Sequence, residues 1–496
     1  MQAGCITQVG MVQSWHLFLT FPQKQGVLGE KMNRRTFNKL IASLATSSFA
    51  MPLRADTKVS SSPLLVEARR TSDQEWNTYE TRTIAQLQGF RPRQRTLNRY
   101  SGIPSNKTKK SGFWHLEKID NRFWMVDPDG GLNIHRAVCS INIGRGERNT
   151  KAFREKFGTR ESWLKATIAL LQENGFNGTG AWTDRAFLMA GANLAFTINL
   201  DIMSKYGTKR GGTFQKDGHI GYPNECIPVF DQEFPAFCEQ YAMETLATFR
   251  DNPDVLGYFS DNEMPFGIRT LENYLEIDNP NDPGRLAAEA WLKERNQTKR
   301  TMTEETRHEF LGFVMDKYMS ITSRAIRKHD PNHLFLGPRI FGRNRDRIHL
   351  IRAIAKYADL ISANYYGLWT PEEEHIKGWT EQTGKPFMFT EWYVKGEDSG
   401  LTNTSGAGWN VRTQKDRGWF YQNYTLAMIE SKNCVGWHWF KYQDNDPTAK
   451  GVDPSNIDAN KGMVDNDFEP YTDLVAAMRE INLSVFDLIE YFDKNG

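Results

Sequence analysis

The segment Val255–Glu263 reads VLGYFSDNE, an apolar run that passes directly into three polar residues. A short continuous apolar run is typical of a strand that is buried on both faces of a sheet. Seven other runs of this kind recur along the chain, and a helical pattern follows each of them. In chain order, the predicted strands are Ile134–Ile141, Phe176–Thr179, Leu194–Asp201, Val255–Ser260, His333–Leu336, Leu360–Asn364, Pro386–Thr390 and Cys434–Trp439.

Strands that alternate with helices predict the α/β class, with a parallel sheet closed as a (β/α)8 TIM barrel. An open, doubly wound sheet is the alternative. It calls for a phosphate-binding glycine turn after an early strand, and Gly144-Arg145-Gly146 lacks the third glycine. The predicted helices are Glu161–Glu173, Glu233–Arg250, Glu304–Lys328, Arg345–Tyr357, Pro371–Thr383, Thr413–Ser431 and Tyr471–Leu483.

The N-terminal residues are predicted to be a targeting segment rather than part of the fold. Residues 1–31 precede Met32 and are expected to come from an over-extended gene start. Residues 32–55 contain the adjacent pair Arg34 and Arg35, then a weakly apolar run that ends in small residues. This arrangement resembles a bacterial twin-arginine export signal, so we expect the mature chain in the periplasm or outside the cell.

Two further segments complete the predicted organisation. Residues 56–110 are polar with little periodicity, which predicts a poorly ordered or wrapping lead-in. The barrel domain is assigned to residues 111–490. It begins with a predicted hairpin, in which Phe113–Glu117 and Arg122–Val126 pair across the turn Asp120-Asn121.

Composition excludes several classes of protein. Lys and Arg total 62 against 60 Asp and Glu, so the chain of 496 residues has no basic excess with which to bind nucleic acid. No apolar stretch is long enough to insert into a membrane. Aromatic residues make up 12% of the chain, including 14 Trp and 17 Tyr, which suggests a surface on which a ligand stacks.

Cysteine usage and motif searches predict no metal and no cofactor. The five cysteines include no Cys-x-x-Cys pair, which disfavours a zinc ribbon or a thioredoxin-like site. Cys226 and Cys238 are close enough in sequence to pair in an oxidising compartment, with buried thiols as the alternative. The chain has no Gly-x-Ser-x-Gly elbow and no His-Glu-x-x-His helix, so a serine hydrolase and a zinc peptidase are disfavoured.

Two glutamates end different predicted strands. The fourth strand runs into Asn262 and Glu263, and the seventh runs into Glu391. In a barrel of this kind the reacting groups sit at the carboxyl ends of the strands, so these side chains can converge. Paired carboxylates are what glycoside hydrolysis requires, since one protonates the leaving oxygen and the other attacks the anomeric carbon or activates water.

Four stretches resemble the (β/α)8 glycosidases that carry their glutamates on strands four and seven. The resemblance is closest to the β-agarases of glycoside hydrolase family 50 and to related enzymes acting on red-algal galactans. It covers residues 111–490, and its two most specific stretches contain the two glutamates. The matching stretches are Asn121–Gly130 (NRFWMVDPDG), Leu256–Phe266 (LGYFSDNEMPF), Pro386–Tyr393 (PFMFTEWY) and Gly462–Asn482 (GMVDNDFEPYTDLVAAMREIN).

The resemblance implies a role for each of these residues. It makes Glu263 the general acid/base, Glu391 the nucleophile and Asn262 a partner for the 2-hydroxyl of the sugar. The implied reaction is retaining hydrolysis of β-galactosidic bonds in agarose, porphyran or carrageenan, with a polysaccharide or oligosaccharide as the binding partner. A different β-linked polysaccharide or a β-galactoside is the alternative substrate.

Aromatic and arginine side chains near the strand ends are the candidate sugar contacts. Related enzymes place a tyrosine near the nucleophile, and Tyr365 or Tyr366 fits that contact. A tryptophan can form a floor under a sugar ring, with core packing as the alternative for each one. The candidate tryptophans are Trp182, Trp392, Trp409, Trp437 and Trp439.

Arginines concentrate after the predicted fifth strand. Guanidinium groups pair with oxyanions, so this cluster suggests a charged galactan as substrate, with a solvated loop as the alternative. The cluster is Arg339, Arg343, Arg345 and Arg347.

Two other classes of function stay open at this point. One is a barrel that binds glycans without cleaving them. The other is a periplasmic oxidoreductase, since twin-arginine export often serves redox proteins, although the chain has no nucleotide, haem or cysteine-cluster motif.

Overall fold

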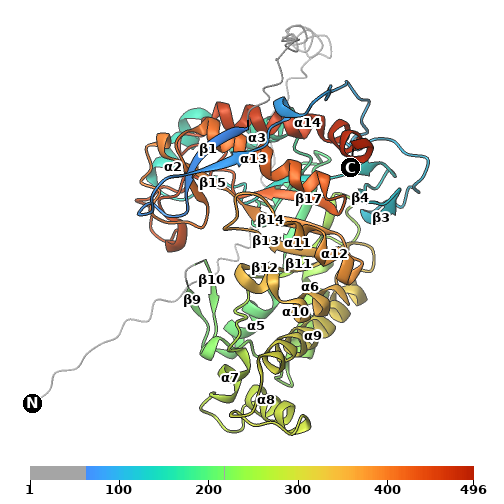
Figure 1. The fold of residues 1–496 in the computed structure, drawn as a ribbon, viewed down its shortest axis with the longest axis vertical. Helices are drawn as coiled ribbons and strands as arrows, with labels where there is room; N and C mark the ends of the chain where they lie inside the picture. Colours follow the sequence, from blue (N-terminus) through green and yellow to red (C-terminus); the bar gives the residue numbers. More distant parts are fainter. Residues whose placement is uncertain (1–62, 217, 496) are drawn as a thin grey trace, which may run out of the picture. The chain divides into compact units, whose positions relative to one another are not determined.

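The computed structural model describes residues 63–216 and 218–495, which belong to one compact unit. The predicted gene start and the export signal with Arg34 and Arg35 lie outside the described residues. Eight parallel strands close into a barrel, as predicted (Figure 1). In chain order they are β6 (His135–Val138), β7 (Gly178–Thr179), β8 (Ala195–Asn199), β11 (Val255–Asn262), β12 (Leu334–Phe341), β13 (Ile361–Asn364), β14 (Phe387–Trp392) and β17 (Cys434–Trp439).

Helices follow the strands, and several carry clear end signals. The longest helix begins after Thr303, whose side chain accepts a hydrogen bond from the backbone of Thr306, and it ends in Arg327, Lys328 and His329. Basic side chains at that end interact favourably with the helix dipole. The main helices are α2 (Glu147–Lys156), α3 (Arg160–Glu173), α5 (Ile202–Arg210), α6 (Phe234–Leu246), α9 (Glu304–His329), α10 (Ile348–Ala355), α13 (Gln414–Glu430) and α14 (Thr472–Asn495).

Short helices fill the remaining connections. Among the described residues, no helix combines the length and apolarity that crossing a membrane requires. Cys226 and Cys238 are free, buried thiols rather than a disulfide. The short helices are α4 (Ala186–Met189), α7 (Thr270–Leu275), α11 (Glu373–Ile376) and α12 (Gly378–Thr383), and the 12-residue α8 (Pro283–Glu294) follows α7.

Small antiparallel units surround the barrel. The hairpin predicted before the first barrel strand forms from β3 (His115–Ile119) and β4 (Arg122–Val126), and β5 (Leu132–Asn133) joins it. A second sheet combines segments far apart in the sequence, because β1 pairs with both β2 and β16. Its strands, and those of a separate hairpin, are β1 (Leu64–Arg69), β2 (Asn77–Thr81), β15 (Val394–Gly396) and β16 (Trp409–Val411), then β9 (Phe214–Lys216) and β10 (His219–Gly221).

A separate cluster of apolar side chains fills the inside of the barrel. Its members from the strands include Leu256, Leu336 and Met388, all fully buried. Tyr100 and Trp114 close the cluster at the amino ends of the strands, where the Tyr100 hydroxyl donates to Asp254 at 3.0 Å. The packed interior leaves the carboxyl ends of the strands as the place where polar side chains can gather.

Candidate active site

Two glutamates meet at the carboxyl end of the barrel. Glu263 follows β11, and Glu391 lies near the end of β14. The side chain of Asn364, the last residue of β13, joins them, because its Nδ2 donates to Glu263 Oε1 at 2.7 Å and to Glu391 Oε2 at 3.2 Å. The two acceptor oxygens are therefore no further apart than these two distances added together, about 5.9 Å.

Neighbouring groups fix the orientation of the Asn364 amide. The Thr390 hydroxyl donates to Asn364 Oδ1 at 3.0 Å, which leaves the amide nitrogen facing the carboxylates. Asn364 is also the register partner of Glu391 across the two strands. The backbone N–H of Tyr365 then donates to the Glu391 carbonyl at 2.8 Å, so strands β13 and β14 hold both side chains at the same level.

Glu391 accepts from a buried arginine and from a tyrosine. Arg339, in β12, is fully buried, and its Nη2 donates to Glu391 Oε2 and to the Thr390 carbonyl, both at 2.7 Å. Its Nη1 donates to Asn262 Oδ1 at 2.8 Å. On the other carboxylate oxygen, the Tyr366 hydroxyl donates to Glu391 Oε1 at 2.9 Å. A charge-assisted network therefore orients the Glu391 carboxylate.

These surroundings give the two carboxyl groups different pKa values. Burial raises the pKa of Glu391, but the Arg339 guanidinium and the Tyr366 hydroxyl oppose the rise. Burial, and then the nearby charge of Glu391, raise the pKa of Glu263 to about 8, although the amide of Asn364 opposes this. Only Glu391 has a cationic hydrogen-bond donor, so Glu391 ionises first and Glu263 keeps its proton near neutral pH.

Residues at the mouth of the barrel adopt unusual backbone conformations. Glu263 has φ of 46°, and Ser140, Trp182 and Asp201, which follow the first three strands, have φ of 53–60°. Residues other than glycine adopt this left-handed region rarely, at a cost of roughly 1–3 kcal/mol, and they do so most often at functional sites. A hydrogen bond of 3.0 Å from the Glu263 N–H to the Arg339 carbonyl holds the conformation of Glu263.

Aromatic rings border the two carboxyl groups. Trp182 is 41% exposed, and its ring centroid lies 4.5 Å from Cζ of Arg339. Phe440 lies just after β17, and its ring centroid is 6.1 Å from that of Trp182 in an edge-to-face arrangement. The ring of Tyr393 lies between those of Phe440 and Tyr366, with its centroid 6.0 Å from that of Phe440 and 5.4 Å from that of Tyr366. The exposed face of Trp182 is suited to the C–H face of a sugar ring, and the buried rings of Phe440 and Tyr393 support it.

Of the two tyrosines predicted beside the nucleophile, only Tyr366 reaches Glu391. Tyr365 is 1% exposed, and its hydroxyl hydrogen-bonds to Nδ1 of His375 at 2.6 Å. Its ring stacks on Phe389 with centroids 4.1 Å apart. The prediction of Tyr365 as a sugar contact is therefore corrected, because side chains of successive residues in extended chain point to opposite sides.

Three predicted sugar platforms instead pack between the barrel and α13. Trp392 stacks on Tyr421 and Tyr424, with centroids 5.2 and 4.6 Å apart. Trp437 Nε1 donates to the Tyr421 hydroxyl at 2.8 Å, and the ring of Trp439 lies 5.9 Å from that of Tyr421. All three tryptophans are at most 1% exposed, so they contribute to the core and not to a sugar surface.

Trp409 also differs from its predicted role. It is 7% exposed, and its ring makes edge contacts with Tyr79 at 5.0 Å and Trp369 at 5.8 Å. The Arg70 guanidinium lies 5.2 Å from the same ring. This tryptophan anchors β16 against β2, and no open ring face remains for a sugar to stack on.

The predicted arginine cluster does not form. Arg339 belongs to β12 rather than to a loop, and Glu391, Asn262 and a carbonyl use its guanidinium. Arg345 donates to the Tyr366 carbonyl at 2.6 Å, whereas Arg343 is exposed on the turn that follows the strand. Because these partners use the guanidinium of Arg339, Arg339 does not share a docking site for sulfate with the arginines of the following turn.

Three residues of the site were not singled out from sequence. Asn364 is the last residue of the sixth strand, and this position alone indicates that its side chain lies at the barrel mouth. Phe440 and Tyr393 each follow a predicted strand, but nothing in the sequence distinguishes them from core aromatics.

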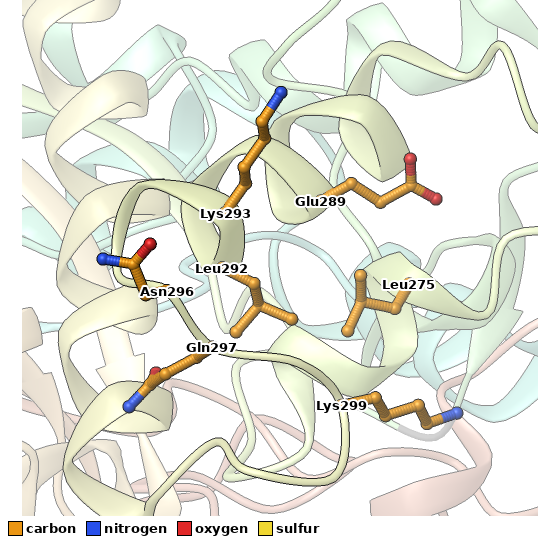
Figure 2. A pocket seen from close by; sticks show the side chains of 7 residues that line it. All are labelled: Leu275, Glu289, Leu292, Lys293, Asn296, Gln297 and Lys299. Atoms are coloured by element: carbon orange, nitrogen blue, oxygen red, sulfur yellow. The ribbon is translucent and has the colours of Figure 1, made fainter.

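A concave surface elsewhere on the molecule lacks these features. Figure 2 shows that its side chains come from α7, α8 and the loop after α8. Glu289 is the one carboxylate among the residues that line it, and none of the residues around Glu391 takes part. The barrel mouth therefore stays the candidate site.

Known proteins resemble the chain over most of its length. The crystal structure of BpGH50 is 32% identical, covers 89% of this chain and 99% of that one, and superposes with a TM-score of 0.78. Two curated relatives from Vibrio sp. (strain JT0107) are Beta-agarase B, 26% identical over 77% of this chain, and Beta-agarase A, 25% identical over 67%. No protein-family model matches the chain.

The barrel, its pair of glutamates and these similarities define the chain as a glycoside hydrolase. It belongs to glycoside hydrolase family 50. The chain spans 49% of the length of Beta-agarase B and 37% of that of Beta-agarase A.

Proposed function

We propose that the chain hydrolyses β-galactosidic bonds in an agarose-type galactan, with Glu263 as general acid/base and Glu391 as nucleophile. The observation that carries the proposal is the amide of Asn364, which hydrogen-bonds to both carboxyl groups. Carboxyl groups of retaining glycosidases lie about 5–5.5 Å apart, against about 6.5–9.5 Å in inverting enzymes. The limit of about 5.9 Å between the bridged oxygens favours the retaining mechanism.

In the first step Glu391 attacks the anomeric carbon while Glu263 gives its proton to the leaving oxygen. The Glu391 carboxylate becomes an ester, so its negative charge disappears. The pKa of Glu263 then falls, because the neighbouring charge that helped to raise it is gone. Glu263 can next take a proton from water, and the water attacks the anomeric carbon of the ester. The bond to Glu391 breaks, the Glu391 carboxylate is restored, and the second inversion at that carbon releases the sugar with its configuration retained.

The choice of substrate rests on the relatives. Both curated relatives carry the name beta-agarase, and a further structure, 19% identical, is described as an exo-beta-agarase. In this chain Trp182, which is 41% exposed, offers a ring face beside the carboxylates on which a sugar can stack. Porphyran and carrageenan differ from agarose by sulfation or linkage, and they serve as the comparison substrates.

The test compares two active-site variants with a matched control. Glu263→Gln and Glu391→Gln are expected to lower kcat on agaro-oligosaccharides by roughly a thousand-fold, with unchanged melting temperature within a few degrees. Glu272 is the control, because it is a buried glutamate that pairs with Arg307 at 2.6 Å, outside the site. Glu272→Gln should keep its kcat. Near-normal turnover by Glu263→Gln or Glu391→Gln would overturn the assignment.

We also propose that residues 32–55 export the chain through the twin-arginine route. The adjacent Arg34 and Arg35 and the weakly apolar run after them support this. Replacing both arginines with lysine should hold the full chain inside the cell, as measured by cell fractionation. Unchanged export of that variant would contradict the proposal.

A further inference from the structure

Two lysines lie behind the aromatic border of the site. Lys441 directly follows Phe440, and Lys461 is 1% exposed with its ammonium 5.2 Å from the Phe440 ring centroid. The Lys441 N–H donates to the Lys461 carbonyl at 3.0 Å, and so does Trp439 Nε1, also at 3.0 Å. The end of β17 therefore fixes both lysines beside the barrel mouth.

Neither ammonium group has an anionic partner. Within the described residues, no carboxylate comes within ion-pair distance of Lys441 or Lys461. Lys441 donates to Asn445 Oδ1 at 2.7 Å, and Lys461 donates to the carbonyl and side-chain oxygens of Asn456. Buried charges are normally paired, because removing an isolated ion from water is costly. Two buried ammonium groups that both lack an ion pair therefore need an explanation beyond folding.

A third buried lysine shows what a purely structural role looks like. The Lys395 ammonium donates to the carbonyl oxygens of Asn403 (3.2 Å), Ser405 (2.8 Å) and Gly406 (3.3 Å). Its three N–H groups thus each have an acceptor, which closes the site. Lys441 has only one such acceptor, so its ammonium retains donors for a ligand.

The electrostatic surroundings fit an incoming anion. Burial lowers the pKa of both Lys441 and Lys461. The charge of Arg145 lowers the pKa of Lys441 further, and the charge of Lys441 lowers the pKa of Lys461 further. The carboxylates that oppose the shift are Asp444 and Asp453 for both lysines, with Glu391 added for Lys461. An anion placed between the two ammonium groups would stabilise their charged forms.

We propose that Lys441, with the buried Lys461 behind it, forms a cationic subsite that binds an anionic substituent, a sulfate ester or a carboxylate, on a sugar of the substrate. The inference rests on the proposed function and names its substrate class more closely. The substrate would then be a galactan that carries charge at some of its residues. The subsite takes over the role that the sequence had suggested for the arginines after the fifth strand.

Binding is measured with the full chain carrying Glu263→Gln, so that hydrolysis does not interfere and Glu391 keeps its charge. Calorimetry compares a neutral agaro-oligosaccharide with its sulfated and its C6-carboxylated counterparts. We expect one charged form to bind about ten-fold or more tighter than the neutral form, and that form identifies the anion. Adding Lys441→Gln or Lys461→Gln should remove the difference, whereas Lys441→Arg should retain most of it.

The control is Lys415→Gln, which removes an exposed lysine that lies over Trp419. It should leave all three affinities unchanged, and melting curves check that each variant is folded. Equal binding of neutral and charged oligosaccharides would overturn the subsite, as would lysine variants that weaken both alike. If none of the oligosaccharides binds, the proposed galactan substrate falls, and the subsite falls with it.

Discussion

Replacing Arg339 with glutamine probes the electrostatic difference between the two glutamates. Arg339 is fully buried, and it is the one cation that hydrogen-bonds to Glu391 within the described residues. A hydrogen bond to a charged group contributes about 1.5–3 kcal/mol, and one pKa unit corresponds to about 1.4 kcal/mol. Losing the guanidinium should therefore raise the lower apparent pKa of the carboxyl pair by about one to two units.

The assay is the pH dependence of kcat/KM on an agaro-oligosaccharide. Hydrolysis requires ionised Glu391, so activity is lost as the pH falls through the pKa of that group. In Arg339→Gln this acid limb should move to higher pH by the same one to two units. At a fixed pH on the limb, kcat/KM should therefore be about 10- to 100-fold lower than in the unsubstituted chain.

A second buried arginine supplies the control. Arg136 is 1% exposed and donates to the carbonyls of Gly175 (2.8 Å) and Ile134 (3.0 Å), away from either glutamate. Arg136→Gln should lower the melting temperature but leave the acid limb in place. If the acid limb of Arg339→Gln coincides with that of the unsubstituted chain, the reasoning about Glu391 is refuted.

Three further outcomes follow from the contacts around the site. Tyr366→Phe removes a hydrogen bond to Glu391 and should lower kcat about ten-fold or more, whereas Tyr365→Phe should change the melting temperature and leave kcat within two-fold. Trp182→Ala should raise KM with little loss of stability, while Trp392→Ala should cost about 3–5 kcal/mol in urea unfolding. Asp458 accepts from Thr and Ser groups of one loop, which lowers its pKa, so Asp458→Asn should lose stability near neutral pH. The difference from the unsubstituted chain should shrink as the pH falls below the usual aspartate pKa of 3.8 and disappear only below the lowered pKa of the folded state.

The barrel could be predicted because its strands are buried on both faces. Such strands read as continuous apolar runs, and all eight were located from them. The same property explains the errors among the tryptophans. Trp437 and Trp439 share a face, as the two-residue period requires, but a strand buried on both sides does not indicate which face points inward. His438 faces inward and contacts His135 at 2.9 Å, so both tryptophans face α13.

The position of Arg339 could not be predicted for a different reason. The fifth strand was predicted to end at Leu336, just before Gly337 and Pro338. In the structure Gly337 has φ of 70°, and the register with β11 shifts there, which is typical of a bulge. The strand continues to Phe341 and directs Arg339 towards Glu391 instead of into a loop.

The most direct measurement is mass spectrometry of the covalent intermediate. The Glu263→Gln variant is given a β-galactoside with a good leaving group. Glu391 should still attack this substrate, because the leaving group needs no proton, but the variant should release the sugar slowly. We expect a proteolytic peptide containing Glu391 to carry the added mass of one glycosyl unit. A sugar attached to any other residue, or turnover through an inverted product without an adduct, would contradict the two-glutamate account.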